Sequence, residues 1–194
     1  VKIKHDIVTF KASAMGFTNV WDMKSKEYQL PTLIDYLIPQ RLAAKSGDVA
    51  SQFFLGFCHV TGKAPCPLDY HVAFKWMEMA AHQNDAGAQF TLAKMYANGN
   101  GVIKDLKKSL KWLRKAAEQN QAAAQFHLGV HYLRGDGVIK NDVIAHMWFN
   151  ISAANGYDKA REPLELMQKY LSQNELENAY NLARKCLKNN IKNC

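Results

Sequence analysis

Three stretches of the chain repeat one another at a spacing of 36 or 37 residues, and this periodicity restricts the fold more than any other feature. Gln89 and Gln125 are 36 positions apart, and the glycines Gly99 and Gly135 have the same spacing. A third copy begins upstream, around Gln52. A fixed period of about 20–50 residues is typical of repeat arrays, in which each unit buries its apolar face only against its neighbours. The chain is therefore predicted to form a solenoid.

Each copy is predicted to contain two helices, called helix A and helix B here, joined by a glycine-containing turn. Apolar or small residues at helical spacing place helix A at 49–61, 86–98 and 122–134. Helix B is expected to begin at residues that cap free amide groups, namely Asp69, Asp105 and Asn141. It is expected to end before residues that adopt left-handed backbone angles, namely Gly47, Asn84, Asn120 and Gly156. One tryptophan in each helix B should be buried between repeats: Trp76, Trp112 and Trp148.

These residues resemble the Sel-one-like repeat, a relative of the tetratricopeptide repeat. The match runs from Ala86 to Ala117, with Ala93 in place of a glycine and Ser109 in place of an alanine, and again from Ala122 to Ala153. The upstream copy departs at His59, where an aromatic residue is expected. The resemblance implies an all-α, right-handed α/α solenoid of three full repeats with irregular caps at both ends. It also implies a protein of the adaptor type, since members of this family share no catalytic residues.

The domain organisation follows from the repeats and the caps. We expect an irregular N-terminal segment, a solenoid with C-terminal capping helices and a short tail, at 1–31, 32–188 and 189–194. Within the solenoid the repeats lie at about 49–84, 85–120 and 121–156, and the capping helices at 158–188. Within the N-terminal segment, 1–11 is expected to be extended and 16–26 to be a loop or a short helix.

The two ends of the array should differ from its middle. Residues 32–46 have the register of a helix B without its helix A, and Pro39 should kink or shorten that helix. Residues 159–170 take the place of a fourth helix A. The sequence from Ser172 to Glu175 is a capping box that opens a last helix.

The net charge of +8 is concentrated in part on one arc of the second helix B. This basic arc consists of Lys107, Lys108, Lys111, Arg114 and Lys115. It could bind an anionic partner such as an acidic protein, lipid head groups or a cell-wall polymer. We favour the simpler interpretation of a solvated outer helix face. Nucleic acid is not an expected partner, because exposed aromatic residues do not alternate with the basic ones.

The four cysteines form two pairs, each separated by eight residues. The pairs are Cys58 with Cys66 and Cys186 with Cys194. Close, even pairing favours disulfides in an oxidising compartment, and hence a periplasmic or secreted protein. The alternative is four free thiols in a cytoplasmic protein. The sequence has no Cys-x-x-Cys motif, which disfavours zinc ribbons and thioredoxin-like redox chemistry.

Variable residues on helix A are the candidate binding site. In tetratricopeptide-like arrays helix A lines the concave groove, so we expect Phe54, Thr91, Met95, His127 and His131 to line it here. His127 and His131 have the spacing of half a zinc site, but no third ligand is evident and an ordinary polar face is favoured. No metal site and no cofactor are therefore predicted.

The sequence contains no recognisable catalytic motif, and we do not expect an enzyme. The preferred function is an adaptor that binds a partner protein or peptide in the groove. The family resemblance, with the cysteines as support, implies a setting in the bacterial envelope or a secretion-linked pathway. One alternative is a periplasmic immunity or inhibitor protein that neutralises a toxin. Another is a cell-wall-directed enzyme or a binder of β-lactam-like ligands. With no run of about 18 apolar residues, no transmembrane segment is expected, and we expect a monomer.

Overall fold

The computed structural model describes residues 33–63, 65–192 and 194. The expected extended stretch at 1–11 and the loop or short helix at 16–26 therefore lie outside the described residues. The chain divides into two units, 1–38 and 39–194, and all three repeats belong to the second. The helix α3 (Leu33–Lys45) contains the boundary between the units.

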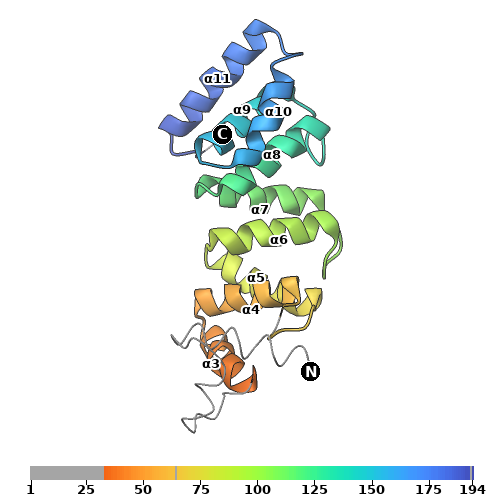
Figure 1. Cartoon of the computed structure of the whole chain (residues 1–194), viewed down its shortest axis with the longest axis vertical. Coiled ribbons are helices and arrows are strands. Elements are labelled where there is room, and N and C mark those ends of the chain that lie inside the picture. The colour runs from red at the N-terminus through yellow and green to blue at the C-terminus, as the bar shows by residue number, and fades with distance from the viewer. Residues whose placement is uncertain (1–32, 64, 193) are drawn as a thin grey trace, which may run out of the picture. The chain divides into compact units, whose positions relative to one another are not determined.

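The three repeats fold as three helix pairs with the expected bounds (Figure 1). Helix A of the repeats is α4 (Val49–Thr61), α6 (Ala86–Asn98) and α8 (Ala122–Arg134). Helix B is α5 (Tyr70–His82), α7 (Leu106–Glu118) and α9 (Asp142–Ala154). Within residues 39–194, each of these helices packs against the next one in the chain, from α4 to α9. The secondary structure of the described residues is entirely helical, which confirms the predicted all-α solenoid.

The predicted helix ends are confirmed by their capping geometry. The side chains of Asp69, Asp105 and Asn141 each accept a hydrogen bond from a backbone amide in the first turn of α5, α7 and α9. The four predicted stop residues all have positive φ: Gly47, Asn84, Asn120 and Gly156. Glycine and asparagine adopt these angles with little steric cost, so each helix B ends at the same register.

Pro39 was expected to kink or shorten its helix, and the shortening is wrong. The helix α3 runs from Leu33 to Lys45 with Pro39 inside it. A proline within a helix removes one backbone donor, and the helix continues past this single lost bond.

A buried glutamine links three helices in each repeat. Gln89 in α6 donates from Nε2 to the Ala81 carbonyl at the end of α5, 3.2 Å away, and its Oε1 accepts from Gln119 Nε2 at the end of α7, 2.8 Å away. The same pair of contacts surrounds the other two glutamines of this register, Gln52 and Gln125. Because the glutamine recurs at the repeat spacing, its side-chain hydrogen bonds form a ladder along the array.

The second glycine of the second and third turns allows neighbouring repeats to approach closely. A Cβ atom at Gly101 would collide with the Tyr70 carbonyl at the start of α5, and one at Gly137 would lie 3.0 Å from the Cβ of Leu106 at the start of α7. Both glycines also have positive φ, which other residues resist. These two turns between helix A and helix B therefore lie on the first turn of the preceding helix B.

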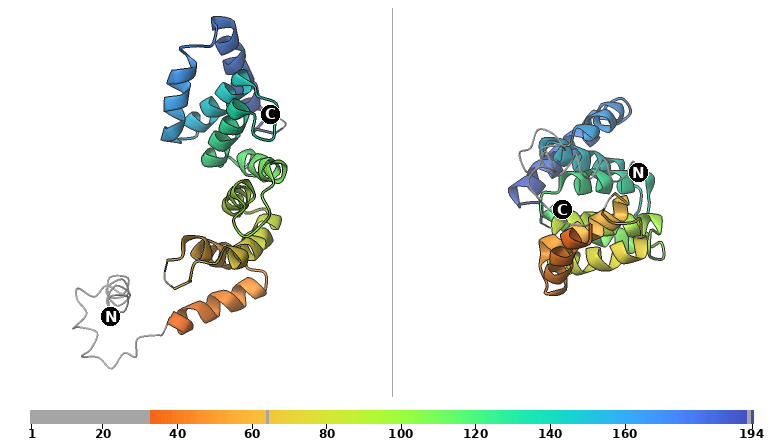
Figure 2. Two further views of the ribbon diagram at one scale, coloured as in Figure 1. Left: turned by 90° about the vertical axis from the view of Figure 1, so that its right-hand side faces the viewer. Right: turned by 60° about the horizontal axis from the view of Figure 1, so that its bottom comes forward.

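The C-terminal cap consists of a 3₁₀ turn (Asp158–Ala160), α10 (Arg161–Met167) and α11 (Gln173–Lys188). The predicted capping box is present, because Ser172 and Glu175 exchange hydrogen bonds at the start of α11. Both α10 and α11 pack against α9 rather than continuing the alternation of the repeats. In Figure 2, α11 lies beside the end of the array as a separate long helix.

The outer face of α9 is apolar because α11 covers it. The lysines Lys108, Lys111 and Lys115 of α7 correspond to Ile144, Met147 and Ile151 in α9. These three residues belong to one apolar cluster with residues of the last helix, and Cys186 Sγ lies 3.8 Å from Met147 Sδ. The residues of α11 that join the cluster are Leu182, Ala183 and Cys186.

A buried histidine marks the junction between α9 and the cap. His146 is fully buried, and neither of its ring nitrogens has a hydrogen-bond partner in the part of the chain that the structure describes. Its ring meets the ring of Tyr180 edge to face, with 5.1 Å between the centroids. Burial in this apolar setting lowers the pKa of His146. The imidazole is therefore neutral and acts as part of the core near pH 7.

Candidate protein-binding surface

Three phenylalanines at one register form an aromatic row along helix A of the repeats. This phenylalanine row consists of Phe53 in α4, Phe90 in α6 and Phe126 in α8, and each is half-buried. Phe57, one turn after Phe53 in α4, is 50% exposed and stacks on Phe53 with 5.9 Å between centroids. Half-exposed aromatic side chains provide a large contact area at low entropic cost, which suits a binding surface.

The row continues along the array because Phe53 and Phe90 reach the next helix A and Phe126 reaches the start of the C-terminal cap. A Cβ atom at Gly87, in the first turn of α6, would lie 3.0 Å from the Phe53 ring. The Phe90 ring lies 5.4 Å from the ring of His127 in α8, and the Phe126 ring lies 5.2 Å from the ring of Tyr157. The predicted binding residue His127 thus belongs to the row, between Phe90 and Phe126.

The charge along this face is positive. Lys94 Nζ lies 5.7 Å from the centre of the Phe90 ring, in a cation–π contact. Burial, with additional repulsion from Lys94, His131 and Lys159, lowers the pKa of His127 to about 4. His127 is therefore a neutral aromatic ring near pH 7, and the lysines supply the charge.

The expectation that Met95 and His131 face solvent is wrong. Their exposed fractions are 2% and 8%. They share a register with Cys58, four residues before the glycine that ends helix A. His131 Nδ1 lies 2.7 Å from the Asp136 carbonyl oxygen in the turn, and Cys58 is bonded to Cys66 in its own turn. In the first and third repeats this register therefore ties helix A to the turn that follows it, whereas Met95 is part of the core cluster.

The remaining predicted groove residues are half-buried in helix A. Phe54 and Thr91 correspond to His127 in the other two repeats. The Thr91 hydroxyl donates to the Gly87 carbonyl one turn earlier, 2.9 Å away, so it is partly satisfied by its own helix. The sequence does contain the signal for the larger aromatic surface, because Phe53, Phe90 and Phe126 follow the repeat spacing one position earlier.

The basic arc is exposed on α7, as the helical spacing predicts. Some of its charges already have partners: Lys108 Nζ lies 3.9 Å from Asp105 Oδ2, and Arg114 donates to the Tyr132 hydroxyl at 3.1 Å. Lys115 lies over the Trp112 ring at 4.7 Å. These contacts support the interpretation of Lys107, Lys108, Lys111, Arg114 and Lys115 as a solvated helix face.

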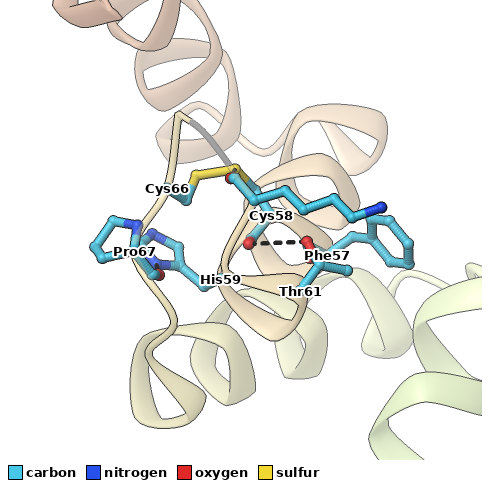
Figure 3. Close-up of a disulfide and its surroundings, with 7 residues drawn as sticks. Phe57, Cys58, His59, Thr61, Cys66 and Pro67 are labelled. Atoms are coloured by element: carbon cyan, nitrogen blue, oxygen red, sulfur yellow. Dashed lines mark hydrogen bonds between the residues drawn. A yellow bond between two sulfur atoms is a disulfide. The ribbon is translucent and has the colours of Figure 1, made fainter. Parts of the chain in front are cut away.

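Both predicted cysteine pairs are bonded in the structure. Cys58 bonds to Cys66 with 5.5 Å between their Cα atoms, and Cys186 bonds to Cys194 with 5.6 Å. Figure 3 shows the first bond, which ties the turn to α4 beside His59. The His59 ring lies against the same turn, with Nδ1 2.9 Å from the Pro67 carbonyl oxygen. His59, which replaces the expected aromatic residue, thus helps to hold the disulfide-bonded turn.

Two kinds of feature were sought among the described residues: metal sites and membrane-spanning helices. In this part of the chain, no cluster of three or more histidine, cysteine, aspartate or glutamate side chains could hold a metal ion. None of the helices in this part of the chain combines the length and the hydrophobicity that a transmembrane span requires.

Comparison with known proteins agrees with this architecture. The family model described as the Sel1 repeat matches three times, at residues 49–85, 86–121 and 122–157. A Sel1 repeat protein from Oxalobacter formigenes is 37% identical, with a TM-score of 0.60, over 67% of this chain and 97% of that protein. A protective antigen of uropathogenic Escherichia coli with an SLR fold is 25% identical, with a TM-score of 0.60, over 80% of this chain and 41% of that protein.

The Helicobacter pylori cysteine-rich protein B is similar in fold. It is 22% identical, with a TM-score of 0.52, over 65% of this chain and 95% of that protein. No curated protein matched the chain. The fold, the capped helix pairs and these matches define a protein of the tetratricopeptide-like α-solenoid class. The chain belongs to the Sel1 repeat family, whose members generally mediate contacts between proteins and typically have no enzymatic activity.

Proposed function

We propose that this protein is a binding module that holds a partner protein on the face formed by α4, α6 and α8. The observation that carries the proposal is the phenylalanine row, in which three aromatic rings at one register pack against the core and remain half-exposed. Aromatic residues contribute a large share of the binding energy in protein interfaces. Phe54, Thr91 and His127 remain in the proposed site, whereas the buried Met95 and His131 would support it from beneath.

The chemistry of this face suits a partner segment that carries both apolar and acidic side chains. The rings of the row would contact the apolar groups. Lys94 beside Phe90, and Lys159 near His127, would attract carboxylates. An acidic partner of this kind also fits the net charge of +8.

We further propose a periplasmic or secreted setting, in which the protein serves as an adaptor of the bacterial envelope or of a secretion-linked pathway. The two disulfides support an oxidising compartment, and the structural relatives are bacterial. An inhibitor that neutralises a toxin would use the same face and differs only in what it binds.

The test uses a partner recovered from the native organism with the wild-type protein as bait. Phe57→Ser with Phe90→Ser should weaken binding of that partner by at least about tenfold, because both changes remove aromatic contact area. Leu166→Ser is the matched control, since Leu166 is 53% exposed on α10 and distant from the row in sequence. Circular dichroism checks that each variant is folded, and isothermal titration measures affinity.

Binding of the partner at the basic arc would contradict this proposal. If Lys108, Lys111 and Lys115→Glu abolish binding while the phenylalanine changes do not, the partner binds α7 instead. Affinity would then also fall steeply with salt, because the contact would be mainly electrostatic.

A further inference from the structure

The turns between helix A and helix B display aliphatic side chains to solvent. Ile103 is 88% exposed and Ile139 is 89% exposed, and they occupy equivalent positions in the second and third turns. Leu68, in the first turn, is 57% exposed. The neighbouring Val102 and Val138 are half-buried and pack against the core. Single exposed apolar residues are common on proteins, but here they recur in every turn.

The three turns form one continuous side of the array, which we call the turn edge (residues 62–63, 65–68, 99–104 and 135–140). The second turn lies on the start of α5, since a Cβ atom at Gly101 would collide with the Tyr70 carbonyl. The third lies on the start of α7, since a Cβ atom at Gly137 would lie 3.1 Å from the side chain of Leu110. In Figure 1 the turns follow one another along the same side of the helix pairs.

The turns are held rigidly, so the isoleucines are fixed in exposed positions. The Asp105 amide donates to the Tyr96 carbonyl at 2.9 Å, and the Asn141 amide donates to the Tyr132 carbonyl at 2.9 Å. The first turn has the equivalent bond, from the Asp69 amide to the His59 carbonyl at 3.1 Å, and the disulfide between Cys58 and Cys66 in addition. Ile103 and Ile139 therefore cannot turn inward without breaking the bonds that define the repeat.

Lysines surround these aliphatic residues. Lys63, Lys104, Lys107 and Lys140 are all exposed at or beside the turns. Of these, only Lys140 forms an ion pair with another described residue, Asp142, at 3.5 Å. Within the turn edge, Lys63, Lys104 and Lys140 outnumber the single acidic residue, Asp136. Beside the edge, Asp69, Asp105 and Asp142 keep their negative charge and are balanced by Lys107, Lys108 and Arg134, so a modest excess of positive charge remains.

From this arrangement we propose that the turn edge docks on the surface of an anionic lipid bilayer, a function separate from the partner-binding face. Ile103 and Ile139 would insert between the acyl chains, and the lysines would lie at the level of the anionic head groups. The side chains project from the ends of the turns instead of lining a recess. Projecting apolar groups with flanking lysines suit a deformable lipid surface better than a preformed protein pocket.

The proposal is tested by flotation with lipid vesicles. The wild-type chain should bind vesicles of phosphatidylcholine with phosphatidylglycerol, and should not bind vesicles of phosphatidylcholine alone. Ile103→Ser with Ile139→Ser should reduce binding by at least about tenfold, because it removes the inserted apolar surface. Leu166→Ser on α10 is the matched control and should bind like the wild type.

A second measurement reports insertion directly. Ile103→Trp places an indole at the edge, whereas Trp112 and Trp148 are buried. Brominated phosphatidylglycerol should quench the additional fluorescence of Ile103→Trp and should not quench that of Leu166→Trp.

Three outcomes would overturn the proposal. The first is the absence of binding to the anionic vesicles. The second is binding that survives the two serine changes and is lost in Lys104→Gln with Lys107→Gln, which would indicate a purely electrostatic contact. The third is concentration-dependent self-association that the serine changes abolish, which would make the edge a contact between copies of the chain.

Discussion

At the residue scale, the glutamine of each repeat has a structural role in the core although its side chain is polar. Gln89 is 1% exposed, yet its amide is satisfied on both sides by helix ends that belong to α5 and α7. A buried polar group that is fully bonded specifies geometry, whereas an unpaired one is costly. The ladder therefore fixes how one helix pair is placed on the next.

Replacement of this glutamine should destabilise the protein measurably. Gln89→Ala removes the bonds to the Gln119 amide and to the Ala81 carbonyl, which then keep only their contacts with Asn84, so the free energy of unfolding should fall by about 1–3 kcal/mol. Urea denaturation followed by circular dichroism measures the change. Gln173→Ala, at an exposed position in the first turn of α11, should change stability little. Equal stability of the two variants would show that the ladder contributes nothing.

Stability should also depend on pH through His127. Its pKa is lowered from 6.5 to about 4, mainly by burial, so the folded protein disfavours the charged imidazole. The unfolded chain binds the proton first as the pH falls below 6.5, and the free energy of unfolding should decrease from there to about pH 4. For this half-buried ring, we expect a loss of about 1–3 kcal/mol.

The substitution His127→Phe isolates this effect, because a phenyl ring fits between Phe90 and Phe126 without a titrating group. Urea midpoints measured near pH 7 and pH 5 should differ less in His127→Phe than in the wild type. His71→Gln removes an exposed histidine and should leave the wild-type dependence in place. An unchanged pH dependence in His127→Phe would place the titrating group elsewhere, with the buried His146 as the next candidate.

At the element scale, the sequence predicted the helices well because their ends depend on local chemistry. Asp69, Asp105 and Asn141 cap their own helices, and the capping box of α11 uses residues three apart. The direction of side chains near a turn was harder to predict. Met95 was expected in the groove, but its side chain is buried in the core cluster, which helical periodicity alone did not indicate.

The packing of α11 depends on contacts far apart in sequence. Its apolar residues indicated a helix with one buried face, but not which helix it would cover. The signal was in α9, where Ile144, Met147 and Ile151 replace the outward lysines of α7. When a position that is exposed in the other repeats carries an apolar residue in one repeat, another element is expected to cover that position.

The disulfide-bonded first turn leads to a prediction about oxidation state. Cys58 and Cys66 close a short loop, so the bond should contribute about 2–3 kcal/mol to stability. Intact-mass measurement after alkylation under non-reducing conditions should find no free thiol, and Cys58→Ser with Cys66→Ser should lower the urea midpoint. Full alkylation of all four cysteines in the native protein would contradict both the bonds and the proposed oxidising compartment.

At the scale of the whole array, the three repeats allow one substitution to be compared at equivalent places. Leu55, Leu92 and Leu128 occupy the same register of helix A, and each is 0% exposed. Replacement by alanine removes the same atoms from each repeat, at a local cost of about 2–5 kcal/mol. Differences in stability between the three variants therefore reflect the position of the substituted repeat in the array.

The central repeat should be the most sensitive. Stability in a solenoid is approximately the sum of the repeats and the interfaces between neighbours. Leu92→Ala weakens a unit with a full repeat on either side, so the whole array should unfold at lower urea in one transition. Leu55→Ala weakens the first repeat, which can unfold while the rest remains paired, so amide exchange should increase mainly in α4 and α5. Identical denaturation curves and exchange patterns for the two variants would show that the array unfolds as one indivisible unit, without the nearest-neighbour behaviour that its repeats predict.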